Sequence, residues 1–436
     1  MRSETSRRAV LWLFGVAALG LAAAFVRFET LGARPLWYDE IYTDRICRGA
    51  STLAEVWQVG KEDSWQHPPL HYALTFLALG VGDSLGFLRL PSALAGVATV
   101  ILLAWLGRAL FDAKVGLAAA LLLGASIYHV AYSLDARPYA LLVALLTGQF
   151  LAFDGAVRGR RFALLWFVLC GTAAVYTHHA ALVVQGVLGL LALAQLAAAW
   201  ADRGGDAAAR SRAVRAAVAR VASFGAIALL YVSQFPNLIQ FLVSHQERAE
   251  VVYTLALTPG FLHQVVARWG AGPGWVAVAY EVAFAAGVVA ILRRCDRSAG
   301  LLLWVAAPFL PYVWIPFAKF FDLRFAIAAL PAFHLVVAVG VVFLAERAAA
   351  AVRALGRPDV AARIALPVAG AVALGVLLAP SAWAYATFRT SRLLCGNFFE
   401  NPAILDADGG FCRRHLILNS LAEPGLLRPR SAPPAP

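Results

Sequence analysis

The chain has 436 residues, of which 61% are hydrophobic and 14% are charged. A soluble domain carries about 25% charged residues, so this composition excludes an ordinary soluble protein and predicts a membrane protein with several spans. The formal net charge of +12 could suggest a nucleic-acid partner. Whether it does depends on how the charges are distributed along the chain.

Several apolar runs are long enough to cross a bilayer as helices, which takes about 20 residues each. The first run follows Arg7-Arg8 and has no Ala-x-Ala cleavage site after it, so we expect a retained span and no signal peptide. The expected spans are about 9–27, 88–110, 115–134, 138–157, 162–178, 180–200, 215–234, 274–292, 299–318, 324–345 and 364–386. The predicted fold class is an all-α polytopic membrane protein with about 11 transmembrane helices.

The charged residues indicate how these spans are oriented. With the N-terminus inside, the inside segments hold 20 Lys and Arg against 8 Asp and Glu, whereas the longer outside segments hold 17 against 16. Short basic loops are typical of the cytoplasmic side. The net charge therefore reflects topology, and no nucleic-acid partner is expected. One acid, Glu281, falls within an expected span.

Three large segments are then expected outside: residues 28–87, 235–273 and a tail over 387–436. The first loop contains two helix-like stretches, Leu53 to Val59 and a run from Pro68-Pro69 to Leu79 that is too short to span and should lie at the interface. Residues 1–386 are predicted to form one transmembrane domain.

The tail is expected to be partly disordered, above all over Arg428 to Pro436, because that stretch is rich in proline. It also contains Cys395 and Cys412, and the sequence leaves open whether these form a disulfide or stay as free thiols.

The segment after the first span, Arg34-Pro-Leu-Trp-Tyr-Asp-Glu-Ile-Tyr-Thr43, carries two adjacent carboxylates, Asp39 and Glu40. Aromatic rings such as those of Trp37 and Tyr38 are typical of a membrane–water interface. A carboxylate held there has less bulk water around it, can have a raised pKa and can accept a proton. Solvated loop charges beside an aromatic anchor would give the same pattern.

A second cluster is Gln66-His-Pro-Pro-Leu-His-Tyr72, in which His67 and His71 are four residues apart. Helical spacing would place both imidazoles on one face. That arrangement suits a metal ion, a hydrogen-bonding role or a helix cap, and the sequence does not choose between them.

Two further clusters contain cations near the outer ends of expected spans. Leu134-Asp-Ala-Arg-Pro-Tyr-Ala140 carries Arg137, and Phe317-Ala-Lys-Phe-Phe-Asp-Leu-Arg-Phe325 carries Lys319 and Arg324. Such cations could bind a lipid phosphate, arginine in bidentate fashion. A snorkelling arginine or an interfacial anchor would look the same. Another outer turn carries His178-His179, which fit either a plain turn or a polar cavity wall.

Taken in order, residues 34–43, His67-Pro-Pro-Leu-His-Tyr72, Ala136-Arg-Pro-Tyr139 and Asp322-Leu-Arg-Phe325 ahead of Pro331 resemble the GT-C membrane glycosyltransferases that use polyprenyl-phosphate sugars. Protein O-mannosyltransferases, lipid A aminoarabinose transferases and rhizobial lipopolysaccharide core transferases are of this kind. The resemblance covers roughly residues 8–345. Phe325 stands where these families usually have Tyr, and the tail resembles none of them.

The resemblance implies a one-step displacement with inversion at the sugar. Asp39 would be the general base, with Glu40 either supporting it or binding the acceptor. Arg324, and with it Lys319 and Arg137, would stabilise the departing lipid phosphate.

The other residues that the resemblance implies are substrate-binding ones, namely His67, Tyr38, Tyr139 and His71. The substrates would be a polyprenyl-phosphate sugar, its tail in a groove among the spans, and an acceptor lipid, glycan or protein. The resemblance makes no cofactor certain, and it leaves a divalent cation open. Nucleotide sugars are not expected as donors, because no Gly-rich nucleotide loop is present.

Three other functions remain as alternatives. A lipid or solute transporter predicts charged residues within spans and two paired halves of the chain. A non-catalytic scaffold predicts that single substitutions at Asp39 or Arg324 leave function intact. A ligase would transfer a glycan from a pyrophosphate-linked lipid. The 34 Arg against 3 Lys are typical of a GC-rich genome, so we expect a bacterial inner membrane with the site facing the periplasm. The sugar and the acceptor stay open.

Overall fold

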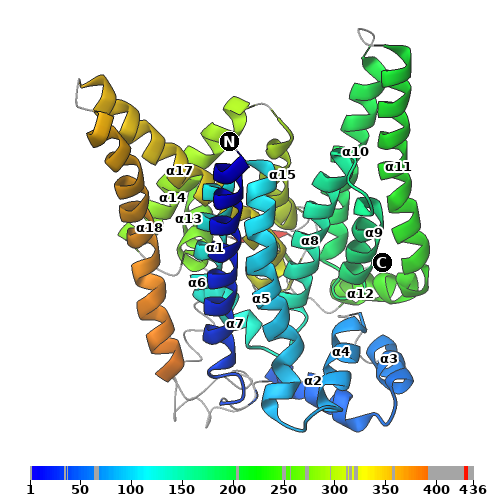
Figure 1. Ribbon diagram of the computed structural model, residues 1–436. Helices are drawn as coiled ribbons and strands as arrows, with labels where there is room; N and C mark the ends of the chain where they lie inside the picture. The colour runs from blue at the N-terminus through cyan, green and yellow to red at the C-terminus, as the bar shows by residue number, and fades with distance from the viewer. Residues whose placement is uncertain are drawn as a thin grey trace.

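The computed structural model describes residues 2–33, 36, 38–62, 68–202, 206–247, 252–255, 257–270, 274–294, 296–310, 313, 317–318, 323–355, 359–390 and 427–430. Over these residues the chain is a bundle of long helices with a layer of short helices at one end (Figure 1). The α-helices are α1 (Arg2–Phe28), α2 (Tyr38–Gly49), α3 (Leu53–Glu62), α4 (Leu70–Leu79), α5 (Leu85–Leu110), α6 (Ala113–Ala125), α7 (Ile127–Ser133), α8 (Tyr139–Val157), α9 (Ala163–Val175), α10 (Ala181–Ala201), α11 (Ala207–Tyr231), α12 (Phe235–Glu247), α13 (Pro259–Trp269), α14 (Trp275–Arg294), α15 (Gly300–Ala306), α17 (Leu330–Ala354) and α18 (Asp359–Thr390). The 3₁₀ helices are η1 (Val232–Gln234), η2 (Arg297–Ala299), η3 (Ala307–Phe309) and η4 (Leu323–Ala329).

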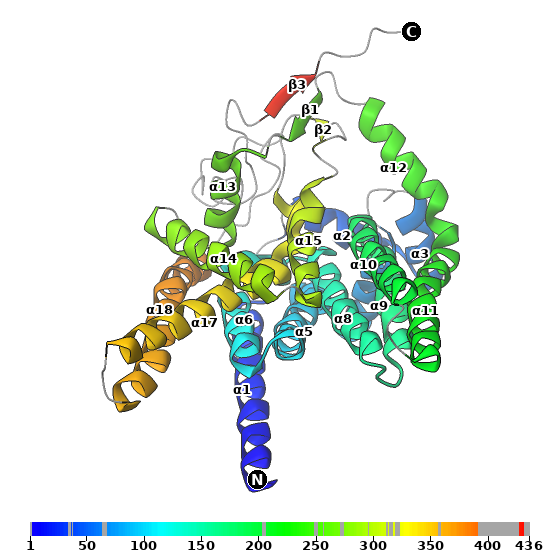
Figure 2. The same cartoon turned by 90° about the horizontal axis from the view of Figure 1, so that it is seen from above.

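A small antiparallel sheet joins three outer segments that are far apart in the sequence. Its strands are β1 (Val252–Leu255), β2 (Phe317–Ala318) and β3 (Leu427–Arg430), in the order β2-β1-β3. Val252 lies opposite Ala318 on one side and Arg430 on the other. Figure 2 shows the three strands together at one side of the helices. The predicted disorder is therefore wrong for Arg428 to Arg430, whereas residues 431–436 lie outside the described part of the chain.

The helices confirm a polytopic membrane protein but not the predicted count of about 11 spans. Seven helices in the described residues are long and apolar enough to cross a membrane, or eight if α6 and α7, which meet at 64°, are counted as one broken span. In the described residues, the expected spans at 162–178 and 299–318 contain shorter apolar helices, Ala163–Val175 and Gly300–Phe309, whereas α18 (Asp359–Thr390) covers the expected span at 364–386. A 13-residue helix such as α9 reaches about 20 Å, short of a hydrocarbon core of about 30 Å.

The short helices of the first outer loop form as predicted. α3 covers the stretch expected from Leu53 to Val59, and α4 begins at Leu70, directly after Pro68-Pro69. Proline is tolerated there because the first N–H groups of a helix lack intrahelical partners. Figure 1 places α2, α3 and α4 together below the long helices. They form a platform at one end of the bundle.

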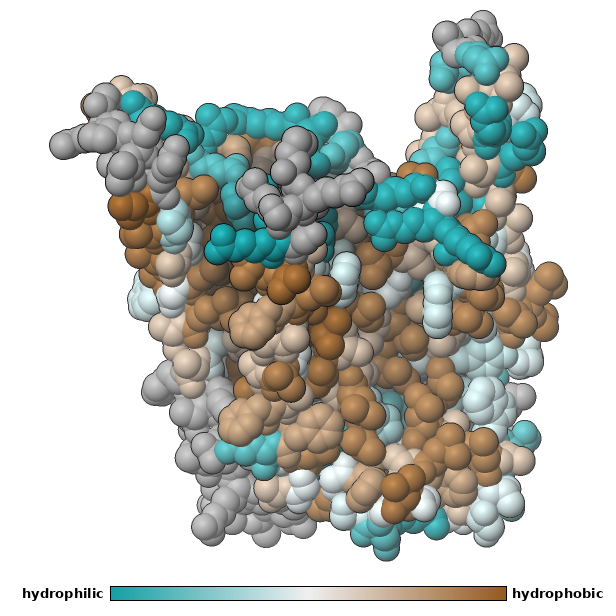
Figure 3. Space-filling view, in the orientation of Figure 1, coloured by the Kyte–Doolittle hydropathy of each residue, from teal (hydrophilic) through white to brown (hydrophobic). Residues whose placement is uncertain are grey.

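The bundle is buried at its centre and apolar on its outside. Of the most apolar 18-residue window of each span, 83% is buried in the span that contains α17, but only 22% in the span that contains α1. Large apolar side chains such as Phe14 and Leu229 are exposed, and Figure 3 shows an apolar band between more polar ends. Such a surface is typical of helices that face lipid.

Two glycines bring α14 and α17 into direct backbone contact. A Cβ atom on Gly340 would lie 1.7 Å from the carbonyl oxygen of Ala283, and one on Gly287 would lie 2.0 Å from that of Val336. Small residues at a membrane helix interface permit this close approach. The pair fixes α17, and with it the preceding helix η4, against the rest of the bundle.

Candidate active site

The two carboxylates after the first span occupy different environments. α2 begins at Tyr38, so Asp39 and Glu40 lie in its first turn, where negative charge is favoured by the helix dipole. Successive side chains on a helix point about 100° apart. The side chain of Asp39 is 21% exposed and that of Glu40 is 0% exposed. Only Asp39 can therefore meet a substrate.

Glu40 binds a buried arginine and a backbone amide. Its Oε1 and Oε2 accept hydrogen bonds from Nε and Nη2 of Arg89, each at 2.7 Å, and Oε1 also accepts one from the N–H of Ala136 at 2.7 Å. Arg89, on α5, is 1% exposed and donates through Nη1 to the carbonyl oxygen of Leu31. This ion pair thus ties together α2, α5, the segment after α1 and the turn between α7 and α8.

The prediction that Glu40 is catalytic therefore needs correction. Both of its oxygens accept strong hydrogen bonds, and no part of the carboxylate reaches the surface, so it cannot contact an acceptor. The geometry leaves the other predicted role, support of Asp39, because Glu40 fixes the first turn of the helix that carries Asp39.

Asp39 meets an arginine from the far end of the chain. Its Oδ2 accepts a hydrogen bond from Nη1 of Arg324, on η4, at 2.7 Å, and the Arg324 side chain is 19% exposed. Arg137, in the turn between α7 and α8, donates through Nη1 to the backbone oxygen of Asp39 at 3.2 Å. The structure therefore brings together the predicted base and two of the three predicted phosphate-binding cations. Lys319 lies outside the described residues.

A third carboxyl group, Asp135, lies in the same cluster and is 4% exposed. Burial raises the pKa of Asp135 well above its ordinary value, and the charge of Glu40 raises it further, against a lowering by Arg89. Burial lowers the pKa of the Arg137 guanidinium, but the charge of Asp39, together with Tyr72 and Tyr139, raises it above its ordinary value. The arginine is charged, and Asp135 holds a proton more readily than an ordinary aspartate.

His71 supports the turn that carries Arg137. It is 1% exposed, and its Nε2 lies 3.1 Å from Oγ of Ser92. The hydroxyl of Ser92 donates its proton to the backbone oxygen of Arg137, so Nε2 of His71 must be the donor in their contact. Burial, and then the charge of Arg137, lowers the pKa of His71 to about 3.

His71 is therefore a neutral positioning residue, which corrects its predicted contact with substrate. Its predicted partner in a metal site, His67, lies outside the described part of the chain. Among the residues that the structure describes, no group of three or more His, Cys, Asp or Glu side chains could hold a metal ion.

Two predicted tyrosines frame the cluster in different ways. Tyr139 begins α8 and is 2% exposed, and its ring packs against Tyr132 and His178. Because it is buried, it shapes the wall of the site more than it offers a surface to a substrate. Tyr38 begins α2, and its side chain is not among the described parts.

The turn histidines divide between the site and the core. Nδ1 of His178 accepts a hydrogen bond from the N–H of Ala180 at 3.0 Å, so the ring proton resides on Nε2. Burial, followed by the charges of His179, Arg137 and Arg324, lowers the pKa of His178 to about 3. His178 is thus a neutral N–H donor beside both arginines, whereas His179 is buried and contacts the hydroxyl of Tyr231.

The residue that sequence reasoning missed is Arg89. It lies at the beginning of a long apolar helix, and a charged residue in a membrane segment is expensive and usually has a specific partner. A charged residue in this apolar run was therefore the feature of the sequence that could have pointed to Arg89. The one acid noted within a span, Glu281, instead contacts His263 of α13 at a half-exposed surface.

Comparison with known families matches part of this region. A family model described as dolichyl-phosphate-mannose-protein mannosyltransferase matches residues 66–205. The matched range includes Arg89, Arg137 and His178 but neither Asp39 nor Arg324. No curated protein has a sequence that matches the chain.

Solved structures match over nearly the whole chain. The apo crystal structure of ArnT from Cupriavidus metallidurans has a TM-score of 0.52 at 15% identity, over 94% of this chain and 76% of that one. The apo oligosaccharyltransferase of Archaeoglobus fulgidus has a TM-score of 0.56 at 15% identity, over 97% of this chain. The match covers 61% of the oligosaccharyltransferase chain. At such identities the similarity establishes a shared fold.

Proposed function

The chain has the GT-C fold of membrane glycosyltransferases, and from that premise we propose that it transfers a sugar from a polyprenyl-phosphate donor to an acceptor, with inversion. The observation that carries the proposal is the contact between Asp39 and Arg324, at 2.7 Å. It joins a partly exposed base and a cation suited to phosphate from segments 285 residues apart in the sequence. Two matching structures support the choice of donor: ArnT was crystallised with undecaprenyl phosphate, and the archaeal oligosaccharyltransferase AglB is in complex with dolichol-phosphate.

Asp39 acts as the general base in the proposed reaction. An acceptor hydroxyl or amine gives its proton to the carboxylate of Asp39, and the oxygen or nitrogen forms a bond to the anomeric carbon. The bond from that carbon to the phosphate oxygen breaks, and its electron pair leaves with the lipid phosphate. Base catalysis of this kind contributes about 10²–10⁴-fold.

Arg324 and Arg137 stabilise the negative charge that develops on the phosphate. The arginines bind the phosphate without protonating it, and Lys319 is retained in the proposal as a third cation. The neutral Nε2–H of His178 can donate to a phosphate or sugar oxygen without changing the charge of the site.

The charges of the cluster favour an incoming anion. Arg89, Arg137 and Arg324 face Asp39, Glu40 and Asp135. Asp135 has a raised pKa, and among the described residues a proton on it would leave two carboxylates facing three guanidinium groups. The site then has an excess positive charge where the donor phosphate would bind.

Donor binding would also activate the base. The ion pair with Arg324 favours the charged form of Asp39 and so lowers its affinity for a proton. A phosphate that draws Arg324 away would weaken this pair, and Asp39 would become a better proton acceptor only when the donor is in place. The same coupling would limit hydrolysis of the donor by water.

The test is release of polyprenyl phosphate by the purified protein. A panel of polyprenyl-phosphate sugars is offered with a crude membrane extract as acceptor, to wild type, Asp39→Asn and Asp44→Asn. Asp44 is the matched control, because it lies on α2 and binds Arg48 on the surface. We expect release by wild type and Asp44→Asn, with one sugar preferred, and none by Asp39→Asn.

Either of two results would contradict this proposal. Normal turnover by Asp39→Asn would place the base elsewhere. Consumption of a pyrophosphate-linked glycan, but of no monophosphate sugar, would indicate a ligase.

A further inference from the structure

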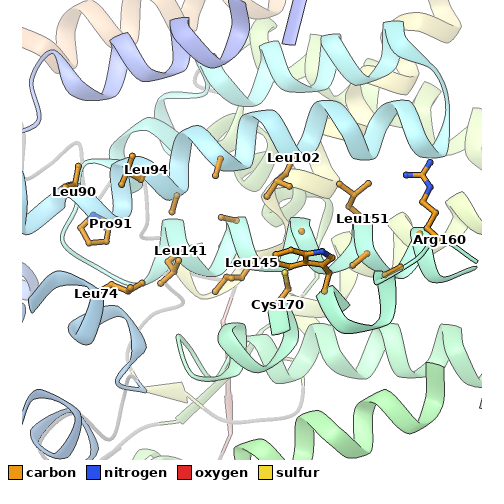
Figure 4. A pocket seen from close by; sticks show the side chains of 18 of the residues that line it. Leu74, Leu90, Pro91, Leu94, Leu102, Leu141, Leu145, Leu151, Arg160 and Cys170 are labelled. Carbon is orange, nitrogen blue, oxygen red and sulfur yellow. The ribbon is translucent and has the colours of Figure 1, made fainter. Parts of the chain in front are cut away.

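A groove with a volume of about 790 Å³ runs along the outside of the bundle between α5 and α8, with α4 and α9 at its edges (Figure 4). Its walls reach the surface, since Leu94 and Trp166 are 53% and 58% exposed. On α8 it extends from Leu141 to Gly155, which is about 21 Å along a helix axis. The groove is therefore long enough for an extended acyl chain within one leaflet of a bilayer about 30 Å thick.

The polar groups of this groove are concentrated at one end. Its lining is Leu, Ala, Gly and Pro except for Trp166, Cys170, Arg160 and Arg161. Both arginines come from the turn between α8 and α9, on the side where the short basic loops lie. Figure 4 shows Arg160 at one end of the groove and Leu74, Leu90 and Pro91 at the other. An amphiphile with an anionic head group fits this groove in one direction only.

We propose that the groove binds one anionic glycerophospholipid of the inner leaflet, with its phosphate at Arg160 and Arg161 and an acyl chain along α5 and α8. Charge complementarity selects an anionic head group, and arginine suits a phosphate. Arg161 is already held beside the groove, because its guanidinium lies 4.5 Å from the ring centre of Phe162.

The occupant differs from the proposed donor in the position of its phosphate. The donor phosphate belongs with Arg324 and Arg137 at the outer end of the bundle, and at that end of the groove no described lining residue is a cation. A lipid bound through Arg160 and Arg161 has its head group on the opposite face of the membrane. The binding site thus does not depend on the proposed reaction.

Binding there would stabilise the helices that carry the active site. α5 carries Arg89 and Ser92 directly beside the groove residues Leu90 and Pro91, and Leu141 follows the turn of Arg137 on α8. A lipid chain packed between the two helices would hold their outer ends at a fixed separation.

The first test is a titration of the detergent-purified protein with phosphatidylglycerol, followed by native mass spectrometry. The variant is Arg160→Gln/Arg161→Gln. The control is Arg347→Gln/Arg353→Gln, which removes two exposed charges from α17 away from the groove. Each arginine near a lipid surface is worth about 1 kcal/mol, so we expect the first variant to bind about 30-fold more weakly and the control to bind like wild type. Equal binding by all three proteins would overturn the proposal.

A second test fills the groove and leaves its arginines in place. A Cβ on Gly148 would lie 3.4 Å from Sγ of Cys170 and 3.7 Å from Cδ1 of Leu102, so Gly148→Leu can be accommodated and would project into the chain-binding space. We expect Gly148→Leu to lose phosphatidylglycerol binding although its head-group site is intact. Unchanged binding would contradict the proposed path of the chain.

The wild-type chain supplies a third measurement that needs no variant. Cys170 lines the groove and is a free, partly buried thiol. In nanodiscs, its alkylation by N-ethylmaleimide, read by peptide mass mapping, should slow when phosphatidylglycerol is added to phosphatidylcholine. An unchanged rate would contradict the proposal, and so would protection by polyprenyl phosphate in place of phosphatidylglycerol.

Discussion

At the scale of single residues, the site separates three carboxyl groups that the sequence places in two short motifs. Asp39 is partly exposed and faces Arg324, Glu40 is fully buried against Arg89, and Asp135 has a raised pKa. Their different surroundings suit different roles: Asp39 is the proposed base, Glu40 anchors α2, and Asp135 has a raised pKa. Mutations at each should therefore have different consequences.

Arg324→Ala should weaken donor binding. A hydrogen bond to a charged group is worth about 1.5–3 kcal/mol, so we expect the dissociation constant of the donor to rise about 10- to 100-fold. Arg324→Lys should recover part of the loss, because lysine keeps the charge without the bidentate geometry. Arg48→Ala is the control, since Arg48 binds Asp44 and Asp83 at the surface. A donor affinity equal to wild type in Arg324→Ala would assign the phosphate to other residues.

The buried histidine His71 should make stability depend on pH. Its folded pKa is about 3 against an ordinary 6.5, so below pH 6.5 the unfolded chain binds a proton that the folded protein does not. Its contribution to stability is thus fully present above pH 6.5 and falls by about 1.4 kcal/mol per pH unit as the pH drops toward 3. Thermal unfolding of wild type and His71→Gln over this range should show a shallower slope in the variant. Equal slopes would show that His71 is protonated in the folded protein.

At the scale of secondary-structure elements, buried contacts fix the short helix α2 and the 3₁₀ helix η4 relative to the long helices. The Glu40–Arg89 ion pair holds α2 to α5, and the contact of α14 with α17 through Gly287 and Gly340 fixes the helix that follows η4. Asp39 lies on α2 and Arg324 lies on η4, so each of the two side chains is carried by an element that these buried contacts fix in place.

Arg89→Met should unfold or displace α2. It would leave a buried carboxylate without its arginine, and breaking a buried pair costs about 3–5 kcal/mol. The double variant Arg89→Met/Glu40→Leu removes both charges and should recover much of the stability, because a well-packed apolar pair can replace a buried ion pair. The measurement compares the unfolding temperature and the turnover of wild type, Arg89→Met and the double variant. If the double variant were less stable than Arg89→Met, the two side chains would not act as a pair.

Gly340→Ala should be destabilising because its new methyl group would overlap the backbone of α14, 1.7 Å from the oxygen of Ala283. Overpacking of this kind costs about 1–3 kcal/mol. Gly370→Ala is the matched control on α18, since a Cβ there has nothing within 4 Å. The comparison is a thermal melt in detergent, and equal melting of the two variants would show that the helices can move apart without cost.

At the scale of the whole molecule, the proposed orientation places the site on the periplasmic face. A reporter fused at Arg210, in the first turn of α11, should read as cytoplasmic, and one fused at Asp406 in the tail as periplasmic. Alkaline phosphatase and green fluorescent protein fusions would distinguish the two sides. The opposite result at either position would invert or break the proposed topology.

The sequence predicted the helical membrane fold and the meeting of Asp39, Arg137 and Arg324 because both depend on signals that a sequence carries. Long apolar runs specify membrane helices, and the motifs retain their order along the chain. The burial of Glu40 and His71 could not be predicted from the sequence. Whether a polar side chain is buried depends on which other elements pack against it, and neighbouring polar residues give no sequence signal that separates the buried one from the exposed one. The count of about 11 spans is not confirmed, because some expected spans contain only a short helix such as α9, which has 13 residues.

The small sheet can be completed only in the order in which its three strands are synthesised. β1 pairs on one side with β2, which precedes η4 and Arg324 by a few residues, and on the other side with β3, near the last residue of the chain. β3 is synthesised after both other strands, so β1 lacks this neighbour until Leu427–Arg430 have been made. A nascent chain therefore passes through a stage in which the described helices are already made while β1 keeps an open edge available to other chains. Translation that stops short of Leu427 would leave the molecule permanently in that stage.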